Sequence, residues 1–281
     1  MTSPRIYGLI GYPVQHSLSP LMHNAAFSYF KINAEYKLFS LKEQEIEVFL
    51  RNLNKNNVSG LNVTVPYKEK VIPFIETISE EAGLIGAVNT IKVINNKLEG
   101  SNTDGEGFLK HLTIDLKFSP AEKKIALIGA GGAARAITVY LCKSKPKSIT
   151  IFDVDKKKLS ALISHLKANF PQINLKPADS IERLQIEESD LLINAAPIGM
   201  KDTDPCLLDE KFIHKDLFVY DLIYNPQETK LLKLARQKDA KVSNGLGMLL
   251  YQGMLAFEIW TGQKAPKEIM QKALLGGLRN A

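Results

Sequence analysis

The chain has 281 residues, and its 36 Lys and Arg against 30 Asp and Glu give a formal net charge of +6. Hydrophobic residues make up 45% and charged residues 23% of the chain, which is typical of a globular protein and excludes a disordered or fibrous one. The length is suited to two domains.

Composition also disfavours several partners and sites. No apolar run reaches the roughly 18 residues of a transmembrane helix, so we expect no membrane partner. Basic residues are spread along the chain among acidic ones, which disfavours nucleic acid, and the densest run, Lys156–Lys158, is typical of a solvated helix face. Cys142 and Cys206 form no CxxC motif, and the histidines lack metal-ligand spacing. We therefore expect no metal and a cytoplasmic location.

Short apolar runs rich in β-branched residues alternate with helical patterns along the chain. This alternation predicts an α/β fold with parallel sheet and helices on both faces. In the N-terminal part the predicted strands are Arg5–Ile10, Ala34–Phe39, Gly60–Val63, Ala87–Ile94 and Lys97–Gly100, with helices over Leu21–Phe30 and Glu43–Asn52. Later strands are predicted over Lys124–Ile128, Ser148–Phe152, Asn174–Lys176, Asp190–Asn194, Leu217–Asp221 and Lys241–Ser243, and final helices over Met248–Trp260 and Lys267–Leu278. A polar turn that contains Pro120 places a domain boundary near residues 105–120.

A glycine-rich turn joins the predicted strand Lys124–Ile128 to a helix. It reads Gly129-Ala130-Gly131-Gly132-Ala133-Ala134, a GxGxxA pattern. The first glycine permits a tight turn, the second lets the backbone approach a pyrophosphate, and the closing alanine permits close helix–strand packing. The helix N-terminus attracts the diphosphate. The turn predicts dinucleotide binding by Gly129, Ala130, Gly131, Gly132 and Ala133, with a ligand-free strand–helix turn as the alternative.

A second indication lies at the end of the following strand, where the chain reads Asp153-Val154-Asp155. An acid at this place hydrogen-bonds the adenosine ribose hydroxyls and repels a 2′-phosphate, which favours NAD over NADP. The alternative is that Asp153 or Asp155 caps the helix that begins at Lys156. The lysines of Lys156–Lys158 are also able to neutralise a phosphate.

Polar residues at strand ends and helix starts of the N-terminal part are candidates for a substrate site. Ser17 and Ser19 suit a carboxylate ligand, although Ser19, followed by proline, is also a typical helix cap. Lys68 opens the next predicted helix, where a lysine is usually solvated. Asn89 and the threonine after it place polar groups in an otherwise apolar strand. Asp104 precedes a further helix and is equally suited to capping it.

Two segments of the C-terminal part have the same character. Asp221-Leu222-Ile223-Tyr224-Asn225-Pro226 follows a predicted strand, and Asn244-Gly245-Leu246-Gly247-Met248-Leu249 opens a helix that carries Gln252. Each is also explained as a turn followed by a cap. The residues alone therefore indicate a nicotinamide enzyme of unknown substrate.

Taken together in chain order, these segments resemble the shikimate dehydrogenase family. The matching stretches run from Gly11-Tyr12-Pro13-Val14-Gln15-His16-Ser17-Leu18-Ser19-Pro20 to Gln252–Trp260. The resemblance implies a Rossmann-type cofactor domain with a parallel sheet over residues 105–244, and a discontinuous α/β substrate domain made of residues 1–104 and the helices of 245–281. It also implies reversible NAD(P)H-dependent reduction of 3-dehydroshikimate to shikimate in aromatic amino-acid and chorismate biosynthesis, by a monomer or homodimer.

The resemblance assigns roles by position. Ser17 and Ser19 hold the substrate carboxylate, and Lys68 is the acid/base residue, paired with Asp104. Because a carboxylate close by favours the charged lysine, we expect Lys68 to donate the proton in the reductive direction. The groups that contact the substrate ring and its hydroxyls are Thr64, Asn89, Asp104, Tyr224 and Gln252, and Leu222 and Gly245 complete the cofactor site.

One departure from the family concerns the cofactor. Its NADP-dependent members usually carry Asn-Arg-Thr where this chain has Asp153-Val154-Asp155. The family default is NADP, whereas these residues favour NAD. The alternatives are therefore an NAD-dependent quinate/shikimate dehydrogenase and a non-catalytic sensor that binds nucleotide and metabolite. The presence of both Lys68 and Asp104 disfavours the sensor.

Overall fold

The computed structural model describes residues 3–278, and the chain divides into two compact units. The first consists of Met1–Gly107 and Leu249–Ala281, the second of Phe108–Met248. The boundaries lie inside two helices, α4 (Asp104–Lys110) and α8 (Leu246–Thr261), whereas the sequence-based boundaries lie at the helix starts. The chain thus passes from one unit to the other within continuous helices and not within loops.

The first unit contains a six-stranded sheet of order β2-β1-β3-β5-β6-β4. Strands β2 (Ala34–Ser40) and β3 (Val58–Val63) are parallel to β1 (Arg5–Gly11), whereas β5 (Thr90–Ile94) is antiparallel to both β3 and β6 (Lys97–Ser101). The short β4 (Thr77–Ile78) pairs with β6. The sheet of this unit is therefore mixed. The turn Asn95–Asn96 joins β5 to β6, and its two residues have φ of 49° and 65°, as in a tight antiparallel hairpin.

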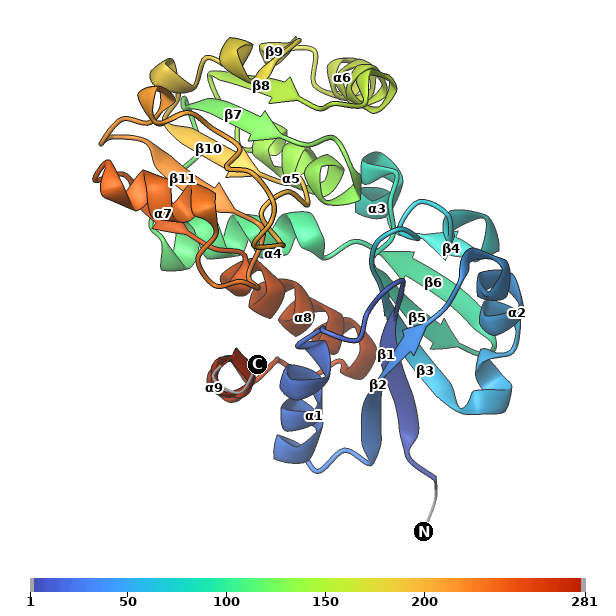
Figure 1. The fold of residues 1–281 in the computed structure, drawn as a ribbon. Coiled ribbons are helices and arrows are strands. Elements are labelled where there is room, and N and C mark those ends of the chain that lie inside the picture. Colours follow the sequence, from blue (N-terminus) through green and yellow to red (C-terminus); the bar gives the residue numbers. More distant parts are fainter. Residues whose placement is uncertain (1–2, 279–281) are drawn as a thin grey trace. The chain divides into compact units, whose positions relative to one another are not determined.

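Helices cover this sheet on its two faces. On one face, α8 packs its Trp260 indole over Gly60 and donates from Nε1 to the Ile91 carbonyl at 2.9 Å. The final helix α9 (Lys267–Leu278) packs against α1 (Ser19–Tyr29), so the end of the chain belongs to the first unit (Figure 1). On the other face, α2 (Ile46–Arg51) and α3 (Glu80–Ile85) enclose an aliphatic core that includes Ile10.

Two elements of this unit differ from the sequence prediction. Strand β5 begins at Thr90, so Asn89 precedes it and does not lie within it. The segment after β3 forms turns and a single 3-10 turn, Ile72–Phe74, in place of a helix opened by Lys68. Pro73 lies in that segment and has no N–H to donate to a helical hydrogen bond, which prevents a longer helix.

The second unit contains an entirely parallel six-stranded sheet of order β12-β11-β10-β7-β8-β9. This order, read outward from β7, is that of dinucleotide-binding doubly wound sheets. The strands are β7 (Lys124–Ile128), β8 (Ser148–Phe152), β9 (Leu175–Pro177), β10 (Leu191–Asn194), β11 (Phe218–Asp221) and β12 (Lys241–Ser243), and the helices are α5 (Gly132–Lys143), α6 (Lys156–Asn169) and α7 (Lys230–Gln237). Among the described helices, none is long and apolar enough to cross a membrane.

Candidate active site

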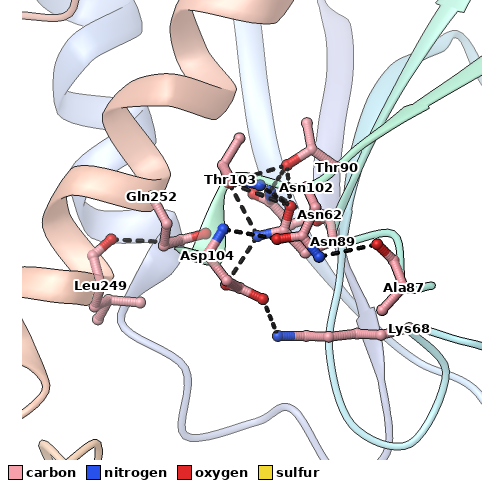
Figure 2. Close-up of polar contacts among 10 residues, drawn as sticks. All are labelled: Asn62, Lys68, Ala87, Asn89, Thr90, Asn102, Thr103, Asp104, Leu249 and Gln252. Carbon is pink, nitrogen blue, oxygen red and sulfur yellow. Dashed lines mark hydrogen bonds and ion pairs between the residues drawn. The ribbon is translucent and has the colours of Figure 1, made fainter. Parts of the chain in front are cut away.

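The central feature of the first unit is a buried ion pair between Lys68 and Asp104. Lys68 Nζ lies 2.6 Å from Asp104 Oδ2, and the two side chains are only 13% and 6% exposed (Figure 2). Lys68 comes from the turn after β3, and Asp104 is the first residue of α4. Little water reaches the pair to screen the attraction between the ammonium and the carboxylate.

Helix capping does not explain Asp104. Its carboxylate accepts from Lys68 Nζ and, at 2.9 Å, from Asn89 Nδ2, while its own N–H donates to Asn102 Oδ1 at 3.0 Å. The capping alternative is therefore wrong for this residue, because Asn102 supplies the acceptor for the helix N–H. The carboxylate is left to bind the ammonium and the amide.

Asn89 lies at the centre of the contacts around this pair. Its Nδ2 also donates to Thr103 Oγ1 at 2.9 Å, and its Oδ1 accepts from the Thr103 N–H at 2.8 Å. A backbone N–H is only a donor, so this contact fixes which end of the amide is oxygen. The nitrogen end consequently faces Asp104, and Asn89 is oriented by the residue that precedes α4.

Ser17 and Ser19 lie in contact at the start of α1. Their hydroxyl oxygens are 3.2 Å apart, and the Ser19 N–H donates to Ser17 Oγ at 3.2 Å. The N-cap position of α1 is Leu18, without a side-chain capping bond, because the helix begins at Ser19 itself. The prediction of a Ser19 cap is therefore wrong, and the two hydroxyls form a small polar pair.

Thr64 and Gln252 belong to the same unit. Thr64 follows β3, donates its N–H to the Ile10 carbonyl at 2.9 Å and packs its methyl group against Gly11. Gln252 lies on α8 and donates from Nε2 to the Leu249 carbonyl at 2.8 Å (Figure 2). At this point α8 approaches α4 closely. A Cβ on Gly107 of α4 would lie only 2.7 Å from the backbone nitrogen of Gln252. Tyr224, in contrast, follows β11 in the second unit, and burial raises the pKa of its phenol.

Several buried polar residues that carry no predicted role hydrogen-bond Asn89, Asp104 or one another. These residues are Tyr36, Asn62, Thr90, Asn102 and Thr103. A signal was present in Asn62, a polar residue that ends an apolar strand, but its partners are distant in sequence. Only the sheet brings them together.

The glycine-rich turn of the second unit fits a diphosphate. Gly129 has φ +111°, and a Cβ there would lie 2.9 Å from the Ala195 carbonyl. Apart from Gly131 and its two neighbours, no atom of the described residues lies within 4 Å of the position that a Cβ on Gly131 would take, so a ligand is able to approach the backbone. Gly131 is the N-cap of α5 and carries no capping side chain, and Ala134 is fully buried against the sheet. The first-turn N–H groups of α5 are thus available to an anion.

The two acidic residues after β8 have different partners. Asp155 is the N-cap of α6 and accepts from the N–H groups of Lys158 and Lys157, which lower the pKa of its carboxyl. Asp153 accepts from the Ala130 N–H at 2.6 Å and from the Asp155 N–H at 2.7 Å. The capping alternative is therefore correct for Asp155 and wrong for Asp153. Since a carboxylate has about four acceptor positions, Asp153 retains capacity for ribose hydroxyls.

Leu222 and Gly245 lie against each other after β11 and β12. A Cβ on Gly245 would collide with the Leu222 carbonyl, so only glycine fits. The turn that carries Leu222 is held by Asp221, whose carboxylate accepts from Asn194 Nδ2 at 2.9 Å and Thr229 Oγ1 at 2.7 Å. Burial raises the pKa of Asp221 despite these hydrogen bonds. Within the described residues, no group of three or more His, Cys, Asp or Glu is placed to hold a metal ion.

Three family models match different parts of the chain. Residues 9–91 match the shikimate dehydrogenase substrate binding domain, and residues 245–275 match the shikimate 5′-dehydrogenase C-terminal domain. Residues 125–203 match the saccharopine dehydrogenase NADP binding domain. The first two matches lie almost wholly in the first unit and the third lies in the second.

Whole-chain comparisons give the same assignment. The chain is 42% identical to the shikimate dehydrogenase (NADP(+)) of Methanopyrus kandleri, over 98% of this chain and 96% of that protein. The structure of shikimate dehydrogenase from Aquifex aeolicus is similar with a TM-score of 0.90 and 39% identity, covering 98% of both chains. That of shikimate 5-dehydrogenase from Listeria monocytogenes in complex with shikimate and NAD has a TM-score of 0.88 and 31% identity, covering 98% and 97%.

Proposed function

This chain belongs to the shikimate dehydrogenase family, and we propose on that premise that it catalyses the reversible NAD(P)H-dependent reduction of 3-dehydroshikimate to shikimate. The reaction is a step of aromatic amino-acid and chorismate biosynthesis. The observation that carries the proposal within the molecule is the buried Lys68–Asp104 pair, with its 2.6 Å separation. A desolvated ammonium is suited to giving a proton to a substrate oxygen.

The proton transfer follows from this pair. A bound nicotinamide would supply the hydride for the carbonyl carbon of the substrate, or would accept one from the alcohol carbon. The substrate oxygen must gain or lose a proton at the same time. In the reductive direction Lys68 Nζ donates that proton, and in the oxidative direction the neutral amine takes it back. Asp104 holds the amine in place through its 2.6 Å contact. A positioned acid or base of this kind contributes about 10²–10⁴-fold to the rate.

Substrate recognition is assigned to further polar residues. We propose that the hydroxyls of Ser17 and Ser19, which are 3.2 Å apart, bind the substrate carboxylate. Two adjacent hydroxyls are able to donate to the two oxygens of one carboxylate. The residues proposed to contact the ring and its hydroxyls are Thr64, Asn89, Asp104, Tyr224 and Gln252.

The dinucleotide is assigned to the second unit. The residues proposed to hold it are Gly129, Ala130, Gly131, Gly132, Ala133, Asp153, Leu222 and Gly245. The space beside Gly131 and the uncapped start of α5 support the diphosphate position. The carboxylate of Asp153 supports NAD, because its negative charge opposes a 2′-phosphate. The compared enzyme of Methanopyrus kandleri is named for NADP(+). Relative to that enzyme, Asp153 is expected to shift the cofactor preference of this chain toward NAD.

The same carboxylate favours one alternative, an NAD-dependent quinate/shikimate dehydrogenase. Rates of the purified enzyme with shikimate and with quinate, each with NAD and with NADP, separate the possibilities. Turnover of shikimate alone supports the biosynthetic enzyme, and comparable turnover of quinate with NAD supports the alternative. Shikimate binding without turnover of any pair would refute catalysis and support a sensor.

We also propose a cytoplasmic enzyme that acts on small molecules as a monomer or homodimer. Both cysteines are free, Cys142 being buried and Cys206 exposed, which suits a reducing compartment. Light scattering during size-exclusion chromatography measures the oligomeric state. A tetramer or larger assembly would contradict this part of the proposal.

A further inference from the structure

We propose that Tyr36 is a positioning residue for the proton-transfer pair, acting through a buried chain of hydrogen bonds that ends on Asp104. This inference rests on the proposed function and extends it to residues that contact neither substrate nor cofactor. All members of this hydrogen-bond chain belong to the first unit. It runs from Tyr36 through Asn62, Thr90 and Asn89 to Asp104.

The hydrogen-bond chain begins at Tyr36 on β2. Its hydroxyl donates to Asn62 Oδ1 at 2.8 Å. Asn62 Nδ2 donates to the Asn89 carbonyl at 3.2 Å and to Thr90 Oγ1 at 3.1 Å. Because a carbonyl only accepts, the amide of Asn62 has one possible orientation, with its oxygen toward Tyr36. Tyr36 must therefore be the donor.

The remaining hydrogen bonds have the same direction. Thr90 Oγ1 accepts from Asn62 and donates its proton to Asn89 Oδ1 at 2.9 Å. Asn89 Nδ2 in turn donates to Asp104 Oδ1 at 2.9 Å, while Lys68 occupies Oδ2 (Figure 2). Every donor thus faces Asp104, the single negative charge at the end. Hydrogen bonds aligned in this way polarise one another, so each strengthens the next.

Burial makes the loss of any member costly. Tyr36, Asn62 and Thr90 are 2%, 4% and 0% exposed. Water therefore has little access to replace a missing partner, and a group left unpaired loses the solvation that it had in the unfolded chain. None of the three is accessible to a ligand, which makes a positioning role the physical interpretation of their hydrogen bonds.

Helix α1 holds Tyr36 in place. Asn24 Oδ1 accepts from the Tyr36 N–H at 2.7 Å, and Asn24 Nδ2 donates to its carbonyl at 3.2 Å. The His23 ring stacks on the Tyr36 ring with centroids 4.5 Å apart and planes 5° apart. Since α1 also begins with Ser19, one helix positions both the proposed carboxylate site and Tyr36, the first member of the hydrogen-bond chain.

The test is Tyr36→Phe, which removes the hydroxyl and keeps the ring. Tyr7→Phe is the matched control, because Tyr7 lies opposite Tyr36 on the neighbouring strand, is also 2% exposed and is not a member of the hydrogen-bond chain from Tyr36 to Asp104. We expect kcat for shikimate to fall about threefold to tenfold in Tyr36→Phe, by more than KM rises, and to stay within twofold of the wild type in the control. Unchanged kcat, or an equal fall in both variants, would overturn the inference.

A second background distinguishes positioning from general destabilisation. If Tyr36 acts through Asp104, adding Tyr36→Phe to Asp104→Asn lowers kcat no further, whereas a general effect lowers it by the same factor in both backgrounds. Should Tyr36→Phe not fold, the pair Thr90→Val and Thr90→Ser decides. We expect the serine, which keeps the hydroxyl, to retain kcat and the valine to lose it; an equal loss in both would overturn the inference. A wild-type enzyme without shikimate turnover would refute the proposed function, whereas an active wild type with unaffected variants refutes only the role of Tyr36.

Discussion

Replacement of Lys68 by methionine is the most direct test of the proposed chemistry. The change keeps most of the side-chain volume and removes the ammonium that lies 2.6 Å from Asp104. If Lys68 transfers the proton, kcat for shikimate is expected to fall by about 10²–10⁴-fold, while KM changes only a few-fold. At about 1.4 kcal/mol for each factor of ten, this loss corresponds to roughly 3–5 kcal/mol of activation free energy.

The structure also predicts a loss of stability in this variant. The Asp104 side chain is only 6% exposed, so removal of Lys68 leaves a buried carboxylate without its cation. Removing one partner of a buried pair typically costs about 3–5 kcal/mol. The double variant Lys68→Met with Asp104→Asn removes the unpaired charge as well, and is expected to recover much of the stability and none of the rate.

The assay combines steady-state kinetics with thermal unfolding of each variant. Lys123→Met is the surface control, because Lys123 lies 3.0 Å from Asp190 and the two side chains are 42% and 36% exposed. An exposed pair contributes about 0–1 kcal/mol, so this variant should keep both kcat and its unfolding midpoint. An effect of Lys68→Met mainly on KM, or recovered activity in the double variant, would refute Lys68 as the acid/base residue.

Three further predictions concern the turn after β8, two glycines of the proposed cofactor site and the pH dependence of stability. Asp153→Asn with Val154→Arg replaces a negative charge with a cation, so kcat/KM for NADP should rise relative to NAD; an unchanged ratio contradicts the proposed role of the turn. Gly131→Ala meets no atom within 4 Å and should fold normally with a raised KM for the dinucleotide, whereas Gly245→Ala collides with backbone and should lower the unfolding midpoint; equal midpoints would contradict this comparison. Burial lowers the pKa of His23 from 6.5 to about 3, so the unfolded chain binds more protons and stability is lost as pH falls through this range, by up to about 1.4 kcal/mol per pH unit. His23→Phe should reduce that slope in urea unfolding between about pH 7 and pH 4, and an equal slope would refute the burial of a neutral imidazole.

Features that depend only on neighbouring residues were predictable from the sequence. The glycine-rich turn between β7 and α5 was readable because its requirements, a tight turn, a close backbone approach and a small packing residue, all fall within Gly129–Ala134. The strand–helix alternation of the second unit was readable because a sheet buried on both faces needs continuous apolar strands. The parallel sheet there is confirmed.

Where one local sequence pattern permits two roles for a residue, the role depends on the tertiary structure. Ser19, Asp104 and Asp155 all precede or open helices, and each was suited to capping on sequence grounds. Only Asp155 caps, because Ser19 lies one residue inside its helix and Asn102 serves the N–H of Asp104. Which acceptor a helix uses depends on backbone conformation at the start of the helix, and spacing does not specify it.

The buried hydrogen-bond chain lay wholly beyond local patterns. Tyr36 lies on β2, Asn62 on β3 and Asn89 just before β5, and their contacts join residues 26 and 27 positions apart. A polar residue in an apolar strand indicates that a partner exists, since a buried polar group must be hydrogen-bonded, but its identity depends on which strands become neighbours. Strand order in the sheet, and not composition or spacing, therefore decided what orients the proposed catalytic carboxylate.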